Sequence, residues 1–201
     1  MSQVWEEGGN PWTVKSTTEV HRNSFFAVES SDVTRPDGSD GAYETVRMRR
    51  LGVGTLAVEA DGTAHMIGQW RFPLGRYSWE LPMGGAEPGE EGLEAAKREL
   101  SEESGIEAVN WIKLVELDLS TSLTDERRVA FLASGLHHRR AHPEAREAIA
   151  RRRAPFMELV ERAEQGLIRE AVTIAAIMSA YRLAASGRLP MSLAAPMLRR
   201  T

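Results

Sequence analysis

Three glutamates, Glu99, Glu102 and Glu103, are spaced so that a helix brings their carboxylates to one side of its axis. At about 100° per residue they fall within an arc of about 100°, beside an apolar arc that includes Leu93 and Leu100. Like charges at these spacings repel one another, so a positive group among them is favourable. Mg²⁺ prefers a few carboxylate oxygens together with water and phosphate. The spacing therefore predicts a metal site along one edge of a helix.

The loop before this helix has the composition of a segment that approaches a ligand closely. It reads Pro82-Met83-Gly84-Gly85 and then Pro88-Gly89, and glycine lets a backbone turn sharply. We expect the main-chain carbonyl of Met83 to add a neutral oxygen ligand to the metal site.

The loop and the helix together resemble the Nudix box. Seven fixed and two aliphatic positions would recur by chance at roughly one in 10⁹ start positions. The resemblance implies that Glu99 and Glu103 are the principal metal ligands and that Glu102 is a further ligand or a bridge to metal water. It also implies that Arg98 orients these carboxylates and that Glu90 buttresses the helix. The matching pattern is Gly84-x5-Glu90-x7-Arg98-Glu99-Leu100-x-Glu102-Glu103-x-Gly105-Ile106.

The flanks resemble the ADP-ribose pyrophosphatase branch of this family over residues 10–185. By that resemblance Arg71 contacts the diphosphate and Glu80 assists near the metals. Trp12 and Tyr43 match positions where relatives place aromatic rings around adenine, and simple packing is the alternative for each. The branch often exchanges N-terminal strands between two subunits, so the resemblance also implies a homodimer.

The loop at residues 120–126 departs from the branch, which usually has a Ser-Pro-Gly-x-Ser-x-Glu-like sequence there. Glu126 remains as a candidate for a ribose hydroxyl. The branch places a late glutamate on a loop that closes over the metals, and Glu147 falls at that position with Glu144 close by. Either carboxylate is a candidate general base, and Glu147 is also a candidate metal ligand. The three histidines of this region, His137, His138 and His142, are read as solvated loop residues.

The resemblance implies hydrolysis of ADP-ribose to AMP and ribose 5-phosphate with Mg²⁺, or Mn²⁺, as cofactor. Two or three metal ions would neutralise the diphosphate and acidify a bound water, and Glu147 or Glu144 would take the proton. Two alternatives stay open. One is a pyrophosphatase for another nucleotide sugar, such as ADP-glucose or GDP-mannose, and the other is a sensor that binds an ADP-ribose-type ligand without cutting it.

Composition limits the other classes of function. The 201 residues include no cysteine, which excludes thiolate metal sites and a cysteine nucleophile. A net charge of −4 does not indicate a broad nucleic-acid-binding surface. The first residues are acidic and unlike a secretory signal, and the apolar run 171–180 is too short to span a bilayer. We therefore expect a cytoplasmic protein with a small-molecule substrate and no membrane partner.

The order of the expected elements predicts an α/β sandwich on a mixed β-sheet, with an N-terminal strand extension. Three regions are expected: an N-terminal β region at 1–50, which could exchange in a dimer and bind the base, a catalytic domain at 51–186 and a loose tail at 187–201. The expected strands are 16–29, 43–48, 52–59, 65–70, 111–119 and 128–132. The expected helices are 90–104, 155–165 and 167–186.

Overall fold

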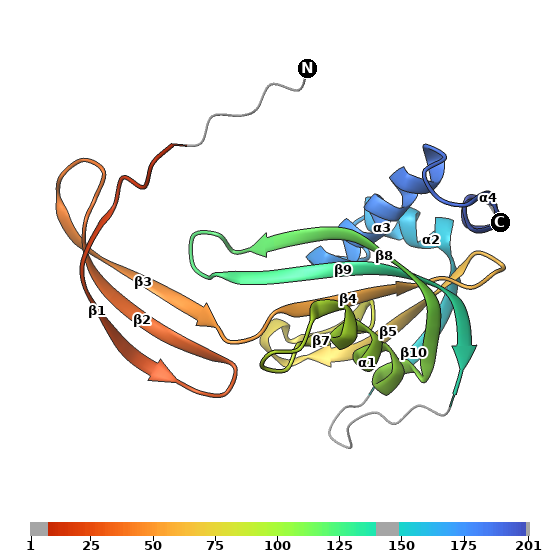
Figure 1. Cartoon of the computed structure of the whole chain (residues 1–201), viewed down its shortest axis with the longest axis horizontal. Helices are drawn as coiled ribbons and strands as arrows, with labels where there is room; N and C mark the ends of the chain where they lie inside the picture. Colours follow the sequence, from red (N-terminus) through yellow and green to blue (C-terminus); the bar gives the residue numbers. More distant parts are fainter. Residues whose placement is uncertain (1–7, 140–148, 200–201) are drawn as a thin grey trace. The chain divides into compact units, whose positions relative to one another are not determined.

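The structure is a computed structural model that describes residues 8–139 and 149–199 (Figure 1). The chain divides into two compact units. The smaller unit contains the residues up to 49 together with 119–126, and the larger contains 50–118 and the residues from 127 onward.

The smaller unit is a three-stranded antiparallel sheet in the order β1-β2-β3. Its strands are β1 (Thr13–Arg22), β2 (Phe26–Thr34) and β3 (Asp40–Met48). The single strand expected over 16–29 is wrong, because the chain turns at Asn23. The Asn23 side-chain oxygen accepts hydrogen bonds from the backbone N–H groups of Phe25, at 2.8 Å, and Phe26, at 2.9 Å. An asparagine that bonds its own backbone in this way stabilises a turn.

The 120–126 loop lies along β3 within the same unit. The Val46 N–H donates to the Leu123 carbonyl at 2.9 Å. Val46 also forms a parallel bridge with Thr124, and the Met48 N–H donates to Asp125 Oδ1 at 2.7 Å. Backbone bonds therefore tie the loop to the strand that carries Tyr43.

The other elements form two sheets covered by helices (Figure 1). One sheet has the order β10-β5-β6 and the other the order β7-β4-β9-β8. Strand β4 runs parallel to β9 and antiparallel to β7, so this sheet is mixed. The strands are β4 (Gly52–Ala57), β5 (Thr63–Arg71), β6 (Arg76–Glu80), β7 (Met83–Gly85), β8 (Ile106–Leu119), β9 (Glu126–His138) and β10 (Ala150–Pro155). The helices are the 3-10 turn η1 (Phe72–Leu74), α1 (Gly92–Ser104), α2 (Phe156–Glu164), α3 (Ala171–Ala185) and α4 (Met191–Met197).

Every residue of β4 is buried, because helices cover both of its faces. On one face the Thr55 hydroxyl reaches the carbonyl of Ala96 in α1, at 3.5 Å. On the other, a Cβ built on Gly54 would lie 3.4 Å from the side chain of Val172 in α3. A strand buried on both faces between helices is the central element of an α/β sandwich, and the predicted fold class is confirmed.

The hairpin expected over 52–70 is only partly right. The turn is present, with Gly62 at a φ of 85° and the Glu59 N–H donating to the Thr63 carbonyl at 2.8 Å. Beyond the bridge between Val58 and Ala64 the two strands separate into different sheets. Strand β4 pairs with β7 and β9, whereas β5 pairs with β6 and β10. The loop expected over 71–89 accordingly contains β6 and β7, which supply these partners.

The C-terminal segment packs on the rest of the larger unit. In α4, Met197 is fully buried and Ala194 is 4 % exposed, although residues 187–201 were expected to form a loose tail. Helix α3 starts at Ala171, with Glu170 as its N-cap, and so begins later than the expected start at residue 167. The buried residues of α3 are Val172, Thr173, Ala176, Ile177, Ala180 and Ala184.

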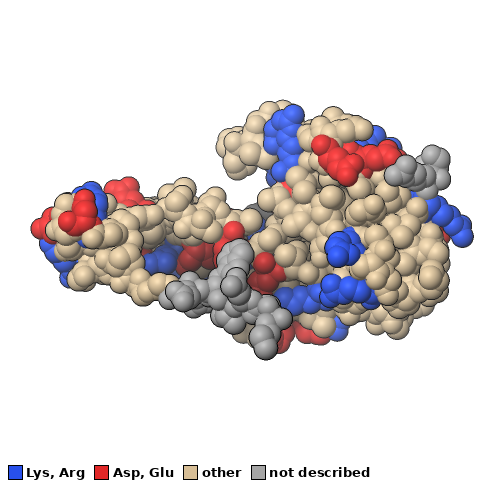
Figure 2. Space-filling view, turned by 90° about the horizontal axis from the view of Figure 1, so that it is seen from above, with Lys and Arg blue, Asp and Glu red and all other residues tan. Residues whose placement is uncertain are grey.

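Surface charge is mixed on the face drawn in Figure 2. Lys and Arg side chains there form small groups interspersed with Asp and Glu. Within 8–139 and 149–199, none of the helices is long and apolar enough to cross a membrane.

Candidate active site

Helix α1 positions the glutamates that the sequence singled out. Its apolar face packs on the sheet through Ala95, Ala96 and Leu100, and all three are fully buried. The helix ends at Gly105, whose φ of 71° is a left-handed conformation that glycine adopts without strain. The carboxylates at 99, 102 and 103 therefore lie on fixed turns of a helix anchored by its apolar face.

Arg98 is the centre of the carboxylate cluster. Its Nη1 donates to Glu99 Oε1 at 2.9 Å and to Glu102 Oε2 at 3.0 Å. Its Nε and Nη2 donate to the two oxygens of Glu90, at 3.1 and 3.0 Å. Nη2 also donates to the main-chain carbonyl of Gly85, at 2.9 Å. One guanidinium thus fixes three carboxylates and the loop before the helix, which suits its rigid fork of donors.

Glu103 is buried, with 6 % of the residue exposed. Its Oε2 accepts a hydrogen bond from the Met83 N–H at 2.9 Å, so the loop before the helix and the end of the helix are joined at this carboxylate. The main-chain carbonyl of Glu103 accepts from Arg151 Nε of β10, at 2.6 Å. Arg151 is a contact that its sequence position did not predict.

Gly84 is required by the position of Glu99. A Cβ built on Gly84 would lie 2.0 Å from the carboxyl carbon of Glu99 and 2.1 Å from its Oε1. Any side chain at position 84 would therefore displace the carboxylate. The glycine of the motif forms a cradle in which the Glu99 carboxylate lies against the backbone.

The electrostatics of the cluster follow from burial and from Arg98. Burial raises the pKa of Glu99, although the neighbouring Arg98 works to lower it. Hydrogen bonding to Glu90 raises the pKa of Arg98 and lowers that of Glu90. Oxygen donors from several partly desolvated carboxylates are a set that fits a hard divalent cation such as Mg²⁺, and Gly84 leaves the Glu99 carboxylate room beside the loop.

Arg71 and Glu80 form an ion pair across the antiparallel strands β5 and β6. Arg71 Nε lies 3.1 Å from each Glu80 oxygen, in a forked arrangement. The Glu80 side chain is 2 % exposed and that of Arg71 is 36 % exposed. The hydrogen bonds that Arg71 donates to Glu80 raise the pKa of Arg71, and the charges of Glu103 and Glu170 add to the effect. The sequence assigned Arg71 and Glu80 separate roles and did not predict their pairing.

Glu170 is another residue that the sequence analysis missed. Its carboxylate accepts from the N–H groups of Val172, at 3.1 Å, and Thr173, at 2.7 Å, and so caps α3. The Thr173 hydroxyl accepts from the Leu81 N–H at 3.1 Å and links α3 to the loop before α1. An acidic residue directly before an apolar helical run was the available signal.

In the smaller unit, Trp12 and Tyr43 contact each other. Their ring centroids are 5.3 Å apart with an interplanar angle of 87°, an edge-to-face geometry. The Tyr43 hydroxyl donates to the Ser122 carbonyl at 2.8 Å. The structure therefore brings together both predicted aromatic residues and the 120–126 loop, and Glu126 is partly buried at the end of that loop.

Glu144, Glu147 and His142 lie outside the described residues. His137 and His138 are exposed, as expected, but they belong to strand β9 and not to a loop. His138 Nε2 lies 2.6 Å from Glu59 Oε1. Strand β9 continues past the expected end at 132, so it carries both histidines.

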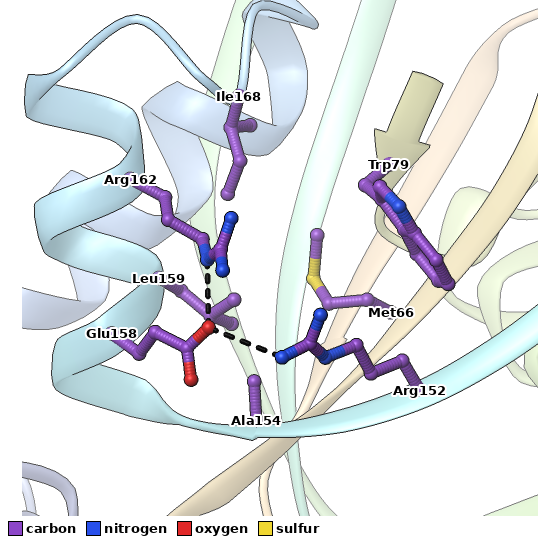
Figure 3. A pocket seen from close by; sticks show the side chains of 8 residues that line it. All are labelled: Met66, Trp79, Arg152, Ala154, Glu158, Leu159, Arg162 and Ile168. Atoms are coloured by element: carbon purple, nitrogen blue, oxygen red, sulfur yellow. Dashed lines mark hydrogen bonds and ion pairs between the residues drawn. The ribbon is translucent and has the colours of Figure 1, made fainter. Parts of the chain in front are cut away.

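A separate small cavity lies between β5, β10 and α2 (Figure 3). Its apolar lining comes from Met66, Leu159 and Ile168, with the Trp79 ring on one side. The two guanidinium groups in the lining, those of Arg152 and Arg162, both pair with Glu158, at 3.4 and 2.7 Å. None of the predicted site residues that the structure describes lines this cavity.

Comparison with known proteins agrees with this geometry. The sequence pattern of the NUDIX domain family matches residues 48–174. An ADP-ribose pyrophosphatase of Mycobacterium tuberculosis (strain ATCC 25618 / H37Rv) is 32 % identical over 173 residues, which cover 84 % of this chain and 82 % of the relative. The ADP compounds hydrolase NudE of Escherichia coli (strain K12) is 28 % identical over 168 residues, which cover 82 % of this chain and 89 % of the relative.

A solved structure supports the fold independently. The crystal structure of an ADP compounds hydrolase superposes with a TM-score of 0.80, covering 92 % of this chain and 100 % of the other, at 24 % sequence identity. The chain belongs to the Nudix family of pyrophosphohydrolases.

Proposed function

We propose that the chain hydrolyses the pyrophosphate bond of ADP-ribose to AMP and ribose 5-phosphate and depends on Mg²⁺. The observation that carries the proposal is the carboxylate cluster of α1, held by Arg98 in the larger unit that also contains the Arg71–Glu80 pair. The similarity to an ADP-ribose pyrophosphatase over 84 % of the chain supports the choice of substrate.

The metal would be held by Glu99, Glu102 and Glu103, with the main-chain carbonyl of Met83 and the carboxylate of Glu147 as further ligands. Mn²⁺ could replace Mg²⁺ there, because both accept oxygen donors. The chemistry that a bound Mg²⁺ supplies is neutralisation of diphosphate charge and acidification of water. Arg98 keeps Glu99 and Glu102 from separating, and the Met83 N–H fixes the orientation of Glu103.

The remaining predicted residues bind substrate or move a proton. Arg71 donates to diphosphate oxygens through Nη1, the guanidinium nitrogen that Glu80 does not engage, and Glu80 holds the guanidinium in place. Glu147 or Glu144 accepts the proton of the attacking water. Water adds to the adenylyl phosphorus, the bond from that phosphorus to the bridging oxygen breaks, and ribose 5-phosphate leaves with the bridging oxygen.

In the smaller unit, Trp12 and Tyr43 stack on adenine, and Glu126 accepts from a ribose hydroxyl. Stacking on aromatic rings contributes affinity for any base, so it favours a nucleotide without selecting adenine strongly. The chain acts as a homodimer in this proposal, and the mass measured by light scattering after gel filtration tests that part.

The experiment is AMP release from ADP-ribose in Mg²⁺, measured beside ADP-glucose and GDP-mannose. Glu103→Gln should lower turnover at least about a hundredfold, because a neutral amide holds a metal poorly while it can still accept from the Met83 N–H. Glu94→Gln is the matched control, since Glu94 lies on the same helix and is exposed beside Lys97. Near-normal turnover of the Glu103 variant would refute the metal site.

Each further outcome changes a different part of the proposal. Faster cleavage of another sugar nucleotide would leave the proposed chemistry unchanged and assign a different substrate. The 120–126 loop, which departs from the ADP-ribose pyrophosphatase branch, makes this the leading alternative. Tight binding of ADP-ribose with no AMP release in Mg²⁺ would identify a sensor. Hydrolysis in ¹⁸O-labelled water should place the label in AMP, and label in ribose 5-phosphate would move the attack to the other phosphorus.

A further inference from the structure

Glu59, His65 and His138 form a cluster that contains none of the α1 carboxylates. Glu59 Oε1 lies 2.8 Å from His65 Nε2 and 2.6 Å from His138 Nε2. Glu59 follows β4, His65 lies on β5 and His138 lies on β9, so the fold brings together three segments. The two imidazole rings face the same carboxylate oxygen, with their centroids 5.5 Å apart.

The distances suit one metal ion. One potential ligand atom from each of these side chains lies within 4.8 Å of the others. Ligands bound at about 2.0–2.1 Å in a tetrahedral site are about 3.3–3.4 Å from one another. To reach that spacing, the 2.8 Å contact to His65 would have to open by roughly 0.5–0.6 Å and the 2.6 Å contact to His138 by roughly 0.7–0.8 Å, which side-chain rotation supplies. The ion would take the place of the two hydrogen bonds between Glu59 and the Nε2 atoms, and each neutral imidazole would then carry its proton on Nδ1.

The donor types favour a different metal from the one expected on α1. Two imidazole nitrogens and one carboxylate oxygen suit Zn²⁺, whereas Mg²⁺ takes oxygen ligands. The side chains of His65 and Glu59 are only 13 % and 16 % exposed, and that of His138 is 54 % exposed. The inner ligands are therefore preorganised, and a fourth position is open to solvent.

The pKa values of two of these side chains, His65 and Glu59, shift toward the forms that bind a metal, a neutral imidazole and a carboxylate. Burial lowers the pKa of His65, which keeps its imidazole neutral at pH 7. Burial works to raise the pKa of Glu59, but the hydrogen bonds from His65 and His138 outweigh it and lower the pKa.

Arg153 carries a positive charge that acts on His65 and so works against a bound cation. It pairs with His65 across the β5–β10 ladder, and its guanidinium is bound to Asp61 at 2.7 Å. Asp61 offsets this positive charge, so Arg153 does not prevent a cation from binding.

We propose that Glu59, His65 and His138 bind one Zn²⁺ ion at a site separate from the Nudix-box glutamates, with water or an anion as the fourth ligand. The site would join the turn after β4 to the end of β9. The proposed zinc site is independent of the proposed substrate, because none of its ligands belongs to α1.

The test is calorimetric titration of the full-length, untagged, EDTA-treated protein with Zn²⁺, in excess Mg²⁺ so that the box glutamates are occupied. One equivalent should bind, and His138→Gln should weaken that binding at least about tenfold. His138 is exposed, so this variant should fold, and a circular dichroism spectrum checks it. Co²⁺ in place of Zn²⁺ should give the visible absorption of a four-coordinate ion, and this absorption should be lost in His138→Gln.

Two control variants locate the ion. His137→Gln changes the neighbouring histidine of β9, which is exposed and outside the cluster, and it should bind Zn²⁺ as the unmodified chain does. Glu103→Gln should also bind one equivalent, because it alters only the box. Binding that survives in His138→Gln, binding lost in Glu103→Gln, or no binding by the unmodified chain would each overturn the proposal.

Discussion

The carboxylate of Glu99 lies against Gly84, at a place that a side chain on residue 84 would occupy. A Cβ at that position would be 2.0 Å from the carboxyl carbon. The loop before helix α1 therefore fits closely against the helix only because residue 84 has no side chain. This contact gives a physical reason for the first glycine of the motif beyond its freedom to turn.

Gly84→Ala should move the Glu99 carboxylate and weaken the metal site. We expect turnover to fall by about a hundredfold, the scale of a misplacement of about 1 Å at a reacting centre, and more Mg²⁺ to be needed for half-maximal activity. Gly85→Ala is the matched control, because its Cβ would meet only the Arg50 side chain, at 3.4 Å. Equal losses in the two variants would contradict this account.

Arg98→Lys should destabilise the metal-free protein more than the protein in Mg²⁺. A lysine cannot reproduce the forked contacts to Glu90, Glu99 and Glu102. We expect the free energy of unfolding in EDTA to fall by about 1–3 kcal/mol, and by less in Mg²⁺, since the ion offsets carboxylate repulsion. Urea denaturation measures both. Arg127→Lys, an exposed arginine paired with Glu116, controls for the substitution itself.

Glu99→Gln should stabilise the metal-free protein at alkaline pH while removing activity. Burial raises the pKa of Glu99 in the folded state, so the folded protein binds this proton more tightly than the unfolded chain does. The stability from the protonated form is present below the unfolded value of 4.5 and is lost as pH rises through the raised pKa. In EDTA at pH 8 the glutamine variant should therefore have the higher Tm. A lower Tm for the glutamine variant would show that the protein itself stabilises the negative charge of Glu99 when no metal is bound.

Trp12→Ala should raise KM for ADP-ribose with a much smaller change in kcat. Base stacking contributes about 1–3 kcal/mol, so the expected rise in KM is roughly 5- to 150-fold. Tyr43→Phe keeps the ring that contacts Trp12 and loses only the bond to Ser122, so it separates stacking from loop anchoring. Phe25→Ala removes an aromatic ring of the same unit that is 63 % exposed, and it should leave KM unchanged.

Sequence predicts best those elements whose pattern lies within a short stretch of the chain. Helix α1 and its carboxylate edge follow from spacing within a few turns, and the structure places Glu99 and Glu102 on one guanidinium. Strand partners are not encoded locally. The turn at Asp61-Gly62 was predicted, but pairing of β4 with β9 depends on residues more than seventy positions later, so β4 and β5 were taken for a simple hairpin.

The same limit applies to the sites. Arg71 and Glu80 were each predicted, but their pairing requires the register of β5 on β6, which the intervening turn sets. Glu59 and His138 are 79 residues apart and have no regular ligand spacing, so no sequence pattern predicts that they meet. Helix α3 begins at Ala171 and not at the expected Leu167, because the Glu170 side chain caps it there.

Because Arg71 pairs with Glu80, the contribution of Arg71 to stability can be measured separately from its contribution to catalysis. Arg71→Met leaves the Glu80 carboxylate, 2 % exposed, without its cation. The expected loss is about 2–3 kcal/mol of unfolding free energy, less than for a fully buried pair because Arg71 is partly exposed. Adding Glu80→Gln removes the unpaired charge, so the double variant should regain more than half of that loss. Its activity should stay low, since neither variant can donate to the diphosphate from position 71. If the double variant recovered turnover as well as its free energy of unfolding, Arg71 would act only by holding Glu80 in place.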